Sequence, residues 1–228
     1  MDNNFTKQVI VARYDEALYK WLLLLGEHPT KITVYNKSNT HIKSVVVDYV
    51  DEIIDLPNVG RESHTYLQHI VDNYDTLADI NVFLQGDPTV HGFKTDMGKY
   101  FNIPGTGRHS RFLHASLGVS KSLCDFTDDP DGMFTKIGRF RKYIQNLDRA
   151  EYTMAHWWKT YISEELPDIK QFKVSWGGCF SVTKDYILTY PKSYYEALLK
   201  TVGWSMDPEQ GHFMERAWAY IYRGTCNG

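Results

Sequence analysis

The sequence is poor in cysteine. Its 228 residues include three, Cys124, Cys179 and Cys226, and none belongs to a Cys-x-x-Cys pair. An odd number of widely spaced thiols is typical of a reducing compartment rather than of a secreted scaffold held by disulfides. We therefore expect no disulfide bond.

A secretion signal and a long apolar run are also missing. The first residues, MDNN, contain no basic stretch followed by an apolar core. The apolar run at residues 21–25 is far shorter than the roughly 20 residues that a membrane span needs. These absences predict a soluble, cytoplasmic protein with no membrane span.

Neither sign of charge dominates. The formal net charge is −3 at pH 7, whereas nonspecific binding to nucleic acid needs a concentrated basic face. Nucleic acid is therefore not an expected partner, although local basic pockets remain compatible with this balance. With 43% hydrophobic residues, the chain is long enough to bury a core without disulfide or metal support. We expect one domain over residues 1–228.

Aromatic residues are abundant, with 16 Tyr, 11 Phe and 6 Trp. Their faces suit stacking on sugars and bases, but packing in the core accounts for most of them.

Strand and helix patterns alternate along the chain. Apolar runs with β-branched residues predict buried strands at residues 8–12, 31–35 and 80–84, and helical spacing predicts helices at 17–25 and 62–74. This alternation favours an α/β domain with a mixed, mainly parallel sheet flanked by helices. Further expected elements are strands at 44–49, 172–176 and 179–182, helices at 136–162, 194–201 and 213–222, and a loop-rich stretch at 93–130.

Polar clusters follow the strands expected at residues 8–12, 31–35 and 80–84. They are Arg13-Tyr14-Asp15-Glu16, Asn36-Lys37 and Gln85-Gly86-Asp87. Ligands of open α/β sheets bind outside the carboxyl ends of the strands, so the clusters predict a binding site there. The alternative is that each cluster is an ordinary solvated loop.

The turn Asn58-Val59-Gly60-Arg61 precedes the helix at 62–74. A helix N-terminus and an arginine together suit a diphosphate, although Gly60 also fits a simple turn with Arg61 paired to Glu62. On the same helix, His64 lies outside the apolar stripe and either faces the ligand edge or has a structural role.

Gly86 and Asp87 fit a site for a metal or a phosphate, because a glycine beside a carboxylate permits close approach. Mn²⁺ or Mg²⁺ would use the Asp87 carboxylate, and His91 would be a further ligand of Mn²⁺. Only one acid is present where two are expected for a metal site, so a site that works without a metal remains an alternative.

Later in the chain, Gly177-Gly178 brings backbone or an aromatic face against a ligand, or forms a β-bulge. Cys179, in an apolar stretch, is expected to be an inert buried thiol. Glu215 is flanked by apolar Phe213, Met214 and Trp218, which would suit a general base. The alternative for Glu215 is a carboxylate that stabilises the start of a helix.

Several segments resemble an uncharacterised domain family of fungal, bacterial and large-DNA-virus proteins. The resemblance extends over roughly residues 8–222 and rests on VIVARYDE, NVGRESHTYLQHIVDNYDTL, VFLQGDP with His91, GGCFSVTKDYI and GHFMERAWAYIY. The polar turn after the first strand, the acid after a central strand and the late acidic residue are also similar, more loosely, to GT-A glycosyltransferases.

The GT-A similarity implies a single Rossmann-like domain and a set of roles. Asp15 or Asn36 would contact the nucleoside, Arg61 and Lys37 the diphosphate, and Asp87 the metal or the sugar. Glu215 would be the base, and Arg13, His64, Gln85 and Gly86 would belong to the donor site. Arg61, Lys37 or Arg216 would neutralise the diphosphate if no metal binds.

The expected function is transfer of a sugar from a nucleotide-sugar donor to a carbohydrate or glycoconjugate acceptor. One alternative is a noncatalytic module that binds carbohydrate or nucleotide. Another is a metal-dependent hydrolase using Asp87 and His91, which no His-x-His or His-Glu-x-x-His spacing supports.

Overall fold

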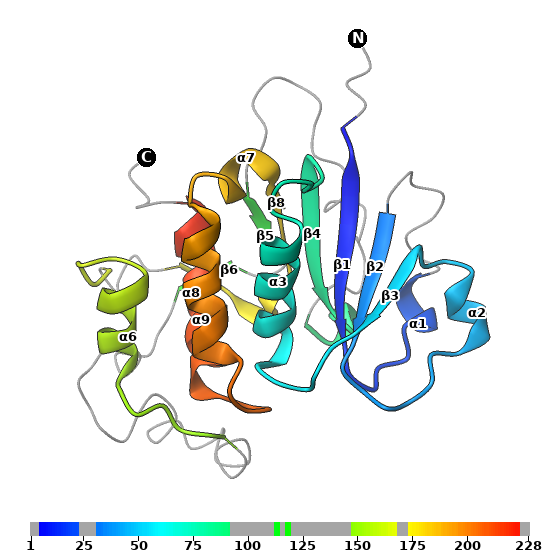
Figure 1. The fold of residues 1–228 in the computed structure, drawn as a ribbon, viewed down its shortest axis with the longest axis horizontal. Helices are drawn as coiled ribbons and strands as arrows, with labels where there is room; N and C mark the ends of the chain where they lie inside the picture. The colour runs from blue at the N-terminus through cyan, green and yellow to red at the C-terminus, as the bar shows by residue number, and fades with distance from the viewer. Residues whose placement is uncertain are drawn as a thin grey trace.

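The fold is a mainly parallel sheet with helices on both faces (Figure 1). The computed structural model describes residues 5–22, 31–91, 112–114, 117–119, 147–167 and 173–223. Six strands form the main sheet in the order β3-β2-β1-β4-β8-β5. Their bounds are Glu52–Asp55 for β3, Lys31–Asn36 for β2, Lys7–Arg13 for β1, Ile80–Gln85 for β4, Phe180–Thr183 for β8 and Phe112–His114 for β5.

Strand β8 has the reverse direction within this sheet. It pairs antiparallel with both β4 and β5, whereas the β1–β2, β1–β4 and β2–β3 pairs are parallel. A separate antiparallel pair joins β6 (Leu117–Val119) and β7 (Lys173–Ser175). These pairings confirm the expected mixed, mainly parallel α/β sheet.

Two apolar cores lie on the two faces of the sheet. In β1, Ile10 faces one core, while Val9 and Val11 face the other, because successive residues of a strand point to opposite sides. The smaller core packs under α1 (Tyr19–Leu22) and α2 (Ser44–Val47). The helices over the larger core are α3 (Arg61–Asp72), α6 (Met154–Tyr161), α7 (Lys184–Ile187), α8 (Lys192–Val202) and α9 (Glu209–Arg223).

The order of the strands creates a crevice at one edge of the sheet. From β1 the chain adds β2 and β3 on one side and then β4 on the other side. Connections that leave in opposite directions open a crevice at the carboxyl ends of the two central strands, here β1 and β4. Ala12 pairs with Gln85 at that edge, and Arg13 pairs with Asn36 of β2.

The prediction of a strand at residues 44–49 is wrong. Residues Ser44–Val47 form helix α2, and the strand comes later, as β3. Ile42 and Val46, four residues apart as on one helix face, are buried in the smaller core, whereas Val47 is 48% exposed. Packing of this one face outweighs the preference of three consecutive valines for a strand.

Other elements differ in extent. Within the helix expected at 17–25, the structure describes α1. Within the helix expected at 136–162, it describes α6 and the non-helical residues 147–153 before it. Strands β5 and β6 lie within the stretch that was expected to be loop-rich. The remainder of residues 93–130, and residues 136–146, lie outside the described residues.

In the described ranges, no helix has both the length and the apolar character needed to cross a bilayer.

Cys179 is a free, fully buried thiol, and burial raises its pKa to about 12. That environment suits the inert thiol expected from the sequence, while Cys124 and Cys226 lie outside the described residues.

Candidate functional site

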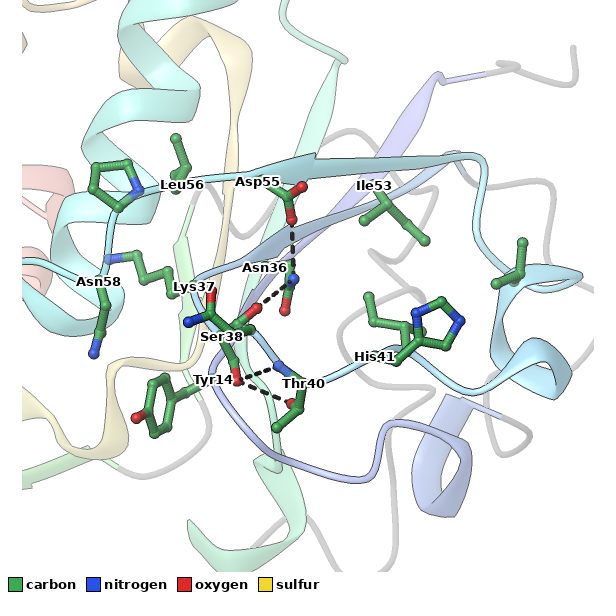
Figure 2. A pocket seen from close by; sticks show the side chains of 14 residues that line it. Tyr14, Asn36, Lys37, Ser38, Thr40, His41, Ile53, Asp55, Leu56 and Asn58 are labelled. Carbon is green, nitrogen blue, oxygen red and sulfur yellow. Dashed lines mark hydrogen bonds between the residues drawn. The ribbon is translucent and has the colours of Figure 1, made fainter.

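Two adjoining cavities lie at the carboxyl edge of the sheet. The larger cavity, of about 780 Å³, lies at the ends of β2 and β3 (Figure 2). The smaller cavity, of about 290 Å³, lies at the ends of β1 and β4. Tyr14, Lys37 and Asn58 line both. The two cavities therefore adjoin at these three side chains.

A chain of hydrogen bonds joins the ends of β1, β2 and β3. Arg13 is buried, and its Nη1 donates to Oδ1 of Asn36 (2.5 Å) and its Nη2 to Oγ1 of Thr40 (3.0 Å). Nδ2 of Asn36 donates in turn to Oδ1 of Asp55 (2.9 Å). Arg13 therefore holds the strand ends together, while Asn36 and Asp55 line the larger cavity.

Asp15 braces the loop that follows β2. Its Oδ1 accepts hydrogen bonds from the hydroxyls of Ser38 (2.7 Å) and Thr40 (2.9 Å), and these bonds lower the pKa of Asp15. Asp15 lines neither the larger nor the smaller cavity. Of the two residues expected to contact a nucleoside, the structure thus brings only Asn36 to the larger cavity.

The amine of Lys37 is fixed between the two cavities. Nζ donates to the backbone carbonyls of Val59 (2.6 Å) and Arg61 (2.5 Å), which belong to the turn before α3. Burial lowers the pKa of Lys37 to about 7, against the opposing effect of the Glu62 charge. Lys37 therefore changes charge near neutral pH, and its protonated form has a third N–H for a ligand.

The turn that leads into α3 has an unusual backbone. Gly60 and Arg61 have φ angles of 63° and 52°, and Arg61 is the one non-glycine residue with positive φ among those described. A side chain at Gly60 would collide with the carbonyl of Val202. A left-handed arginine costs about 1–2 kcal/mol, and such strain is commonly found at binding sites.

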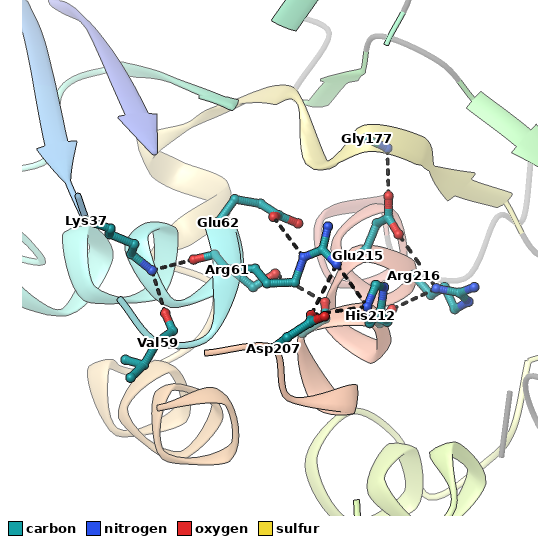
Figure 3. A network of polar contacts seen from close by, with 11 residues as sticks. Lys37, Val59, Arg61, Glu62, Gly177, Asp207, His212, Glu215 and Arg216 are labelled. Carbon is teal, nitrogen blue, oxygen red and sulfur yellow. Dashed lines mark hydrogen bonds and ion pairs between the residues drawn. The ribbon is translucent and has the colours of Figure 1, made fainter. Parts of the chain in front are cut away.

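The Arg61 side chain is the centre of a polar network (Figure 3). Its Nη1 lies 3.2 Å from Oδ1 of Asp207 and 3.1 Å from Nε2 of His212, and its Nε lies 3.6 Å from Oε2 of Glu62. Burial opposes ionisation of Asp207, but His212 and Arg61 hold its pKa below the usual value. With 36% of its side chain exposed, Arg61 is held in place yet accessible from the smaller cavity, which it lines.

Glu215, the expected base, contacts donors within the protein. Its Oε1 accepts a hydrogen bond from the N–H of Gly177 (2.8 Å), and its Oε2 lies 3.7 Å from Nη1 of Arg216. The side chain is 19% exposed and lines neither cavity. Its apolar neighbours in the sequence, Phe213, Met214 and Trp218, are buried in the larger core.

Two carboxylates to which the sequence assigned no ligand contact of their own line the smaller cavity. Glu16 was expected only as part of the polar cluster after the first strand, and Glu62 only as a possible partner of Arg61. Oε2 of Glu16 accepts a hydrogen bond from the N–H of Tyr14 (2.7 Å), and its carboxylate packs where a side chain at Gly86 would be. Their sequence signal was weak, because each is one acid within a charged run.

The cluster after β4 has mixed roles. Gln85 lines the smaller cavity, and the carbonyl of Gly86 accepts a hydrogen bond from Nε1 of Trp21 (2.8 Å). Oδ1 of Asp87 accepts from both the N–H (3.1 Å) and the hydroxyl (2.5 Å) of Thr89, so it caps the 3₁₀ helix η2 (Pro88–His91).

Of the two expected metal ligands, the structure describes the side chain of Asp87. Across the residues that the structure describes, no group of three or more His, Cys, Asp or Glu side chains is arranged to hold a metal ion. His91 is the last residue of η2, and its side chain lies outside the described part.

His64 lies away from both cavities. It is buried, and its ring is close to Gly203 at the end of α8. Burial and the charge of Lys37 lower the pKa of His64 to about 4, so the ring is neutral at neutral pH. This location favours the structural role that the sequence left open.

The cavities differ in the chemistry that they offer. The larger has amide, carboxylate and hydroxyl groups beside the half-exposed ring of Tyr14. The smaller has three cationic side chains, Arg13, Lys37 and Arg61, and two carboxylates. Together they suit an elongated ligand with a polar planar group at one end and an anionic group beside it.

Comparison with known proteins gives one match. A family model described as a protein of unknown function (DUF3431) matches residues 9–227. No curated protein and no solved structure matches the chain.

Proposed function

The chain belongs to the DUF3431 family of proteins of unknown function, and from its site we propose that it transfers a sugar from a nucleotide-sugar donor to a hydroxyl acceptor. The family match confirms the resemblance to a domain family of unknown function. The proposal goes further and rests on the looser similarity with GT-A glycosyltransferases. A mainly parallel sheet with a crevice at its carboxyl edge supports a GT-A-like fold.

The nucleoside is assigned to the larger cavity. Its volume, about 780 Å³, falls within the usual range for small-molecule sites. Asn36 and Asp55 offer hydrogen-bonding groups for a base or a ribose, and the exposed face of Tyr14 offers a stacking surface.

The diphosphate is assigned to the smaller cavity, and this assignment carries the proposal. Lys37 from the end of β2 and Arg61 from the start of α3 meet there, beside a cavity large enough for a nucleoside. An arginine can form paired hydrogen bonds with a phosphate, and the positive end of α3 adds to the attraction. The two side chains would neutralise the nucleoside diphosphate as it leaves.

A divalent cation is the second means of neutralising the diphosphate. Asp87 would then bind Mn²⁺ or Mg²⁺, and it would have to exchange its hydrogen bonds with Thr89 for the metal. We favour the cationic arrangement because Lys37 and Arg61 already line the smaller cavity.

The reaction is a displacement at the anomeric carbon. The acceptor oxygen forms a bond to that carbon, the bond from the carbon to the diphosphate oxygen breaks, and the diphosphate leaves with the electron pair. A basic side chain takes the proton of the acceptor hydroxyl. The acceptor is a carbohydrate or a glycoconjugate.

Ligand-dependent thermal stability tests the proposal. The full chain is heated with UDP-, GDP- and CMP-sugars, with and without Mn²⁺, and release of the nucleotide is followed in parallel. We expect one donor class to stabilise the protein without Mn²⁺, and Arg61→Ala to weaken its binding at least tenfold. Lys31→Ala, which removes an equal charge from a surface ion pair with Glu52, is the matched control.

The other results have distinct meanings. Stabilisation that needs Mn²⁺ and is lost in Asp87→Ala would establish the metal-assisted form. Stabilisation without any nucleotide release, even with acceptor sugars present, would favour the noncatalytic binding module. If no nucleotide or nucleotide-sugar shifts the melting temperature, the transferase proposal is wrong.

A further inference from the structure

Glu62 is a nearly buried carboxylate with few partners. Its side chain is 10% exposed. Within the described residues it forms an ion pair with Nε of Arg61 at 3.6 Å and accepts no hydrogen bond. An ionised carboxylate has about four acceptor positions, and the Glu62 oxygens are not among the described buried atoms that lack a hydrogen-bond partner, so they are open to the cavity that the residue lines. Glu62 therefore has acceptor positions available for a ligand.

The place of Glu62 in the cavity fits a ligand with hydroxyl groups. It lies in the first turn of α3, directly after Arg61, and lines the smaller cavity together with Lys37 and Gln85. On its other side is the turn of η5 (Trp176–Gly178), where Gly178 has a φ of +60°. A Cβ at Gly178 would lie 3.2 Å from Cγ of Glu62, so glycine gives this turn room beside the carboxylate.

Glu215 has a different environment. One of its oxygens accepts from the N–H of Gly177, and the other faces Arg216. It lines neither cavity. Glu215 therefore holds the η5 turn in position, while the neighbouring glycine of the same turn borders Glu62.

We propose that Glu62 is the general base that takes the proton from the acceptor hydroxyl. This rests on the proposed transfer reaction. In this displacement the acceptor approaches the anomeric carbon from the side opposite the diphosphate, so the base and the cations that bind the diphosphate must line one cavity that holds the sugar between them. Glu62 lines the same cavity as Lys37 and Arg61. The proton passes to Glu62 as the acceptor oxygen bonds to the anomeric carbon, and the diphosphate leaves with the electron pair.

The test compares variants in the release of nucleotide from the donor that stabilises the protein most, with water or added sugars as the acceptor. Glu62→Gln keeps the shape of the side chain and removes its basicity. We expect it to lower the rate at least a hundredfold, as loss of a general base does, while the donor still raises the melting temperature. Glu62→Asp should keep part of the rate.

Two other variants complete the design. Glu52→Gln changes a surface carboxylate paired with Lys31 and should release nucleotide at the wild-type rate. Glu215→Gln should lose less activity than Glu62→Gln, because the amide can still accept from Gly177. The melting temperature of each variant without ligand shows whether it is folded, and Glu62→Asp replaces Glu62→Gln in the comparison if the latter is not.

The outcomes separate this proposal from the one on which it rests. If Glu62→Gln keeps more than a tenth of the wild-type rate, or if Glu215→Gln loses more, Glu62 is not the base. If the wild-type chain binds donors without releasing nucleotide, or binds none, then the transfer reaction itself fails, and the base role with it. In that case the failure is seen in the wild-type protein rather than in a variant.

Discussion

Nζ of Lys37 donates a hydrogen bond to the backbone carbonyl of Arg61 at 2.5 Å. The two residues assigned to the diphosphate are thus joined directly, although Lys37 directly follows β2 and Arg61 begins α3. The turn between them is also fixed by the N–H of Gly60, which donates to the carbonyl of Ser205 (2.7 Å). A ligand would not have to assemble these cations, and preorganisation of this kind favours binding.

The pKa of Lys37 predicts that binding depends on pH. Because this pKa is about 7, the amine is mainly protonated at pH 6 and mainly neutral at pH 8. The affinity for an anion should therefore be roughly tenfold higher at pH 6 than at pH 8. Calorimetry with a nucleotide-sugar is the suitable measurement, because its diphosphate diester keeps the same charge over this range.

The matched variant for this prediction is Lys37→Arg. Arginine stays protonated at both pH values, so the variant should bind with little pH dependence whatever its absolute affinity. A wild-type affinity that is equal at pH 6 and pH 8, or a Lys37→Arg variant with the same pH dependence as the wild type, would contradict the role given to Lys37.

A substitution at Gly60 should be strongly destabilising. Gly60→Ala places a Cβ against the carbonyl of Val202 and the side chain of His64, at a φ of +63°. We expect the free energy of unfolding to fall by about 2–4 kcal/mol, as for strained or overpacked sites. Denaturant unfolding measures the loss.

Gly203→Ala is the comparison for Gly60→Ala. Gly203 has a φ of −86°, and a Cβ there would lie 3.4 Å from the carbonyl of Leu199. Its effect should stay within about 1 kcal/mol. Equal losses in the two variants would show that the backbone of the α3 turn is not the strained position described above.

Two buried histidines predict loss of stability in mild acid. Burial lowers the pKa of both His64 and His69 to about 4, from about 6.5 in the unfolded chain. Between these values the unfolded state binds more protons, so stability falls as the pH drops. By pH 5 the loss should be about 1–2 kcal/mol for each histidine relative to pH 6.5.

Denaturant unfolding at pH 6.5 and pH 5 checks this prediction. The interval ends at pH 5 because carboxylates with lowered pKa values, such as Asp15 and Asp207, lose their contribution at lower pH. His69→Phe removes one titrating ring and should reduce the pH dependence by about half, although it also removes the hydrogen bond to the Tyr35 hydroxyl (3.0 Å). An unchanged dependence would mean that His69 is protonated in the folded state.

Much of the sheet was predictable, because its central strands have clear local signals. β1, β2 and β4 are short apolar runs rich in β-branched residues, and the rule for carboxyl ends placed Lys37 and Gln85 correctly at the crevice. Helix α2 was not predictable from its valines. Its conformation depends on which face packs on the smaller core, and that is a property of the tertiary structure.

The site was less predictable, because its contacts join distant parts of the sequence. Arg61 and Asp207 are 146 residues apart, and the space beside Glu62 depends on Gly178. Local sequence showed the charge of each residue but not its partners. For the same reason the sequence did not show that Asp15 braces the loop after β2, or that Arg13, which lines the smaller cavity, also joins the strand ends. The role of Glu215 as a base stays a prediction.

The pairing of β8 with β4 also has a consequence for the order of folding. β1 to β4 pair within one continuous stretch of the chain, whereas β8 pairs with residues of β4 that are about a hundred positions away. Closing so long a loop is slow compared with local pairing. During synthesis the strand ends that carry Arg13 and Lys37 are made first, and the turn that borders Glu62 follows with β8. Arg61 gains its partners Asp207 and His212 only after both, because they lie later in the chain than β8.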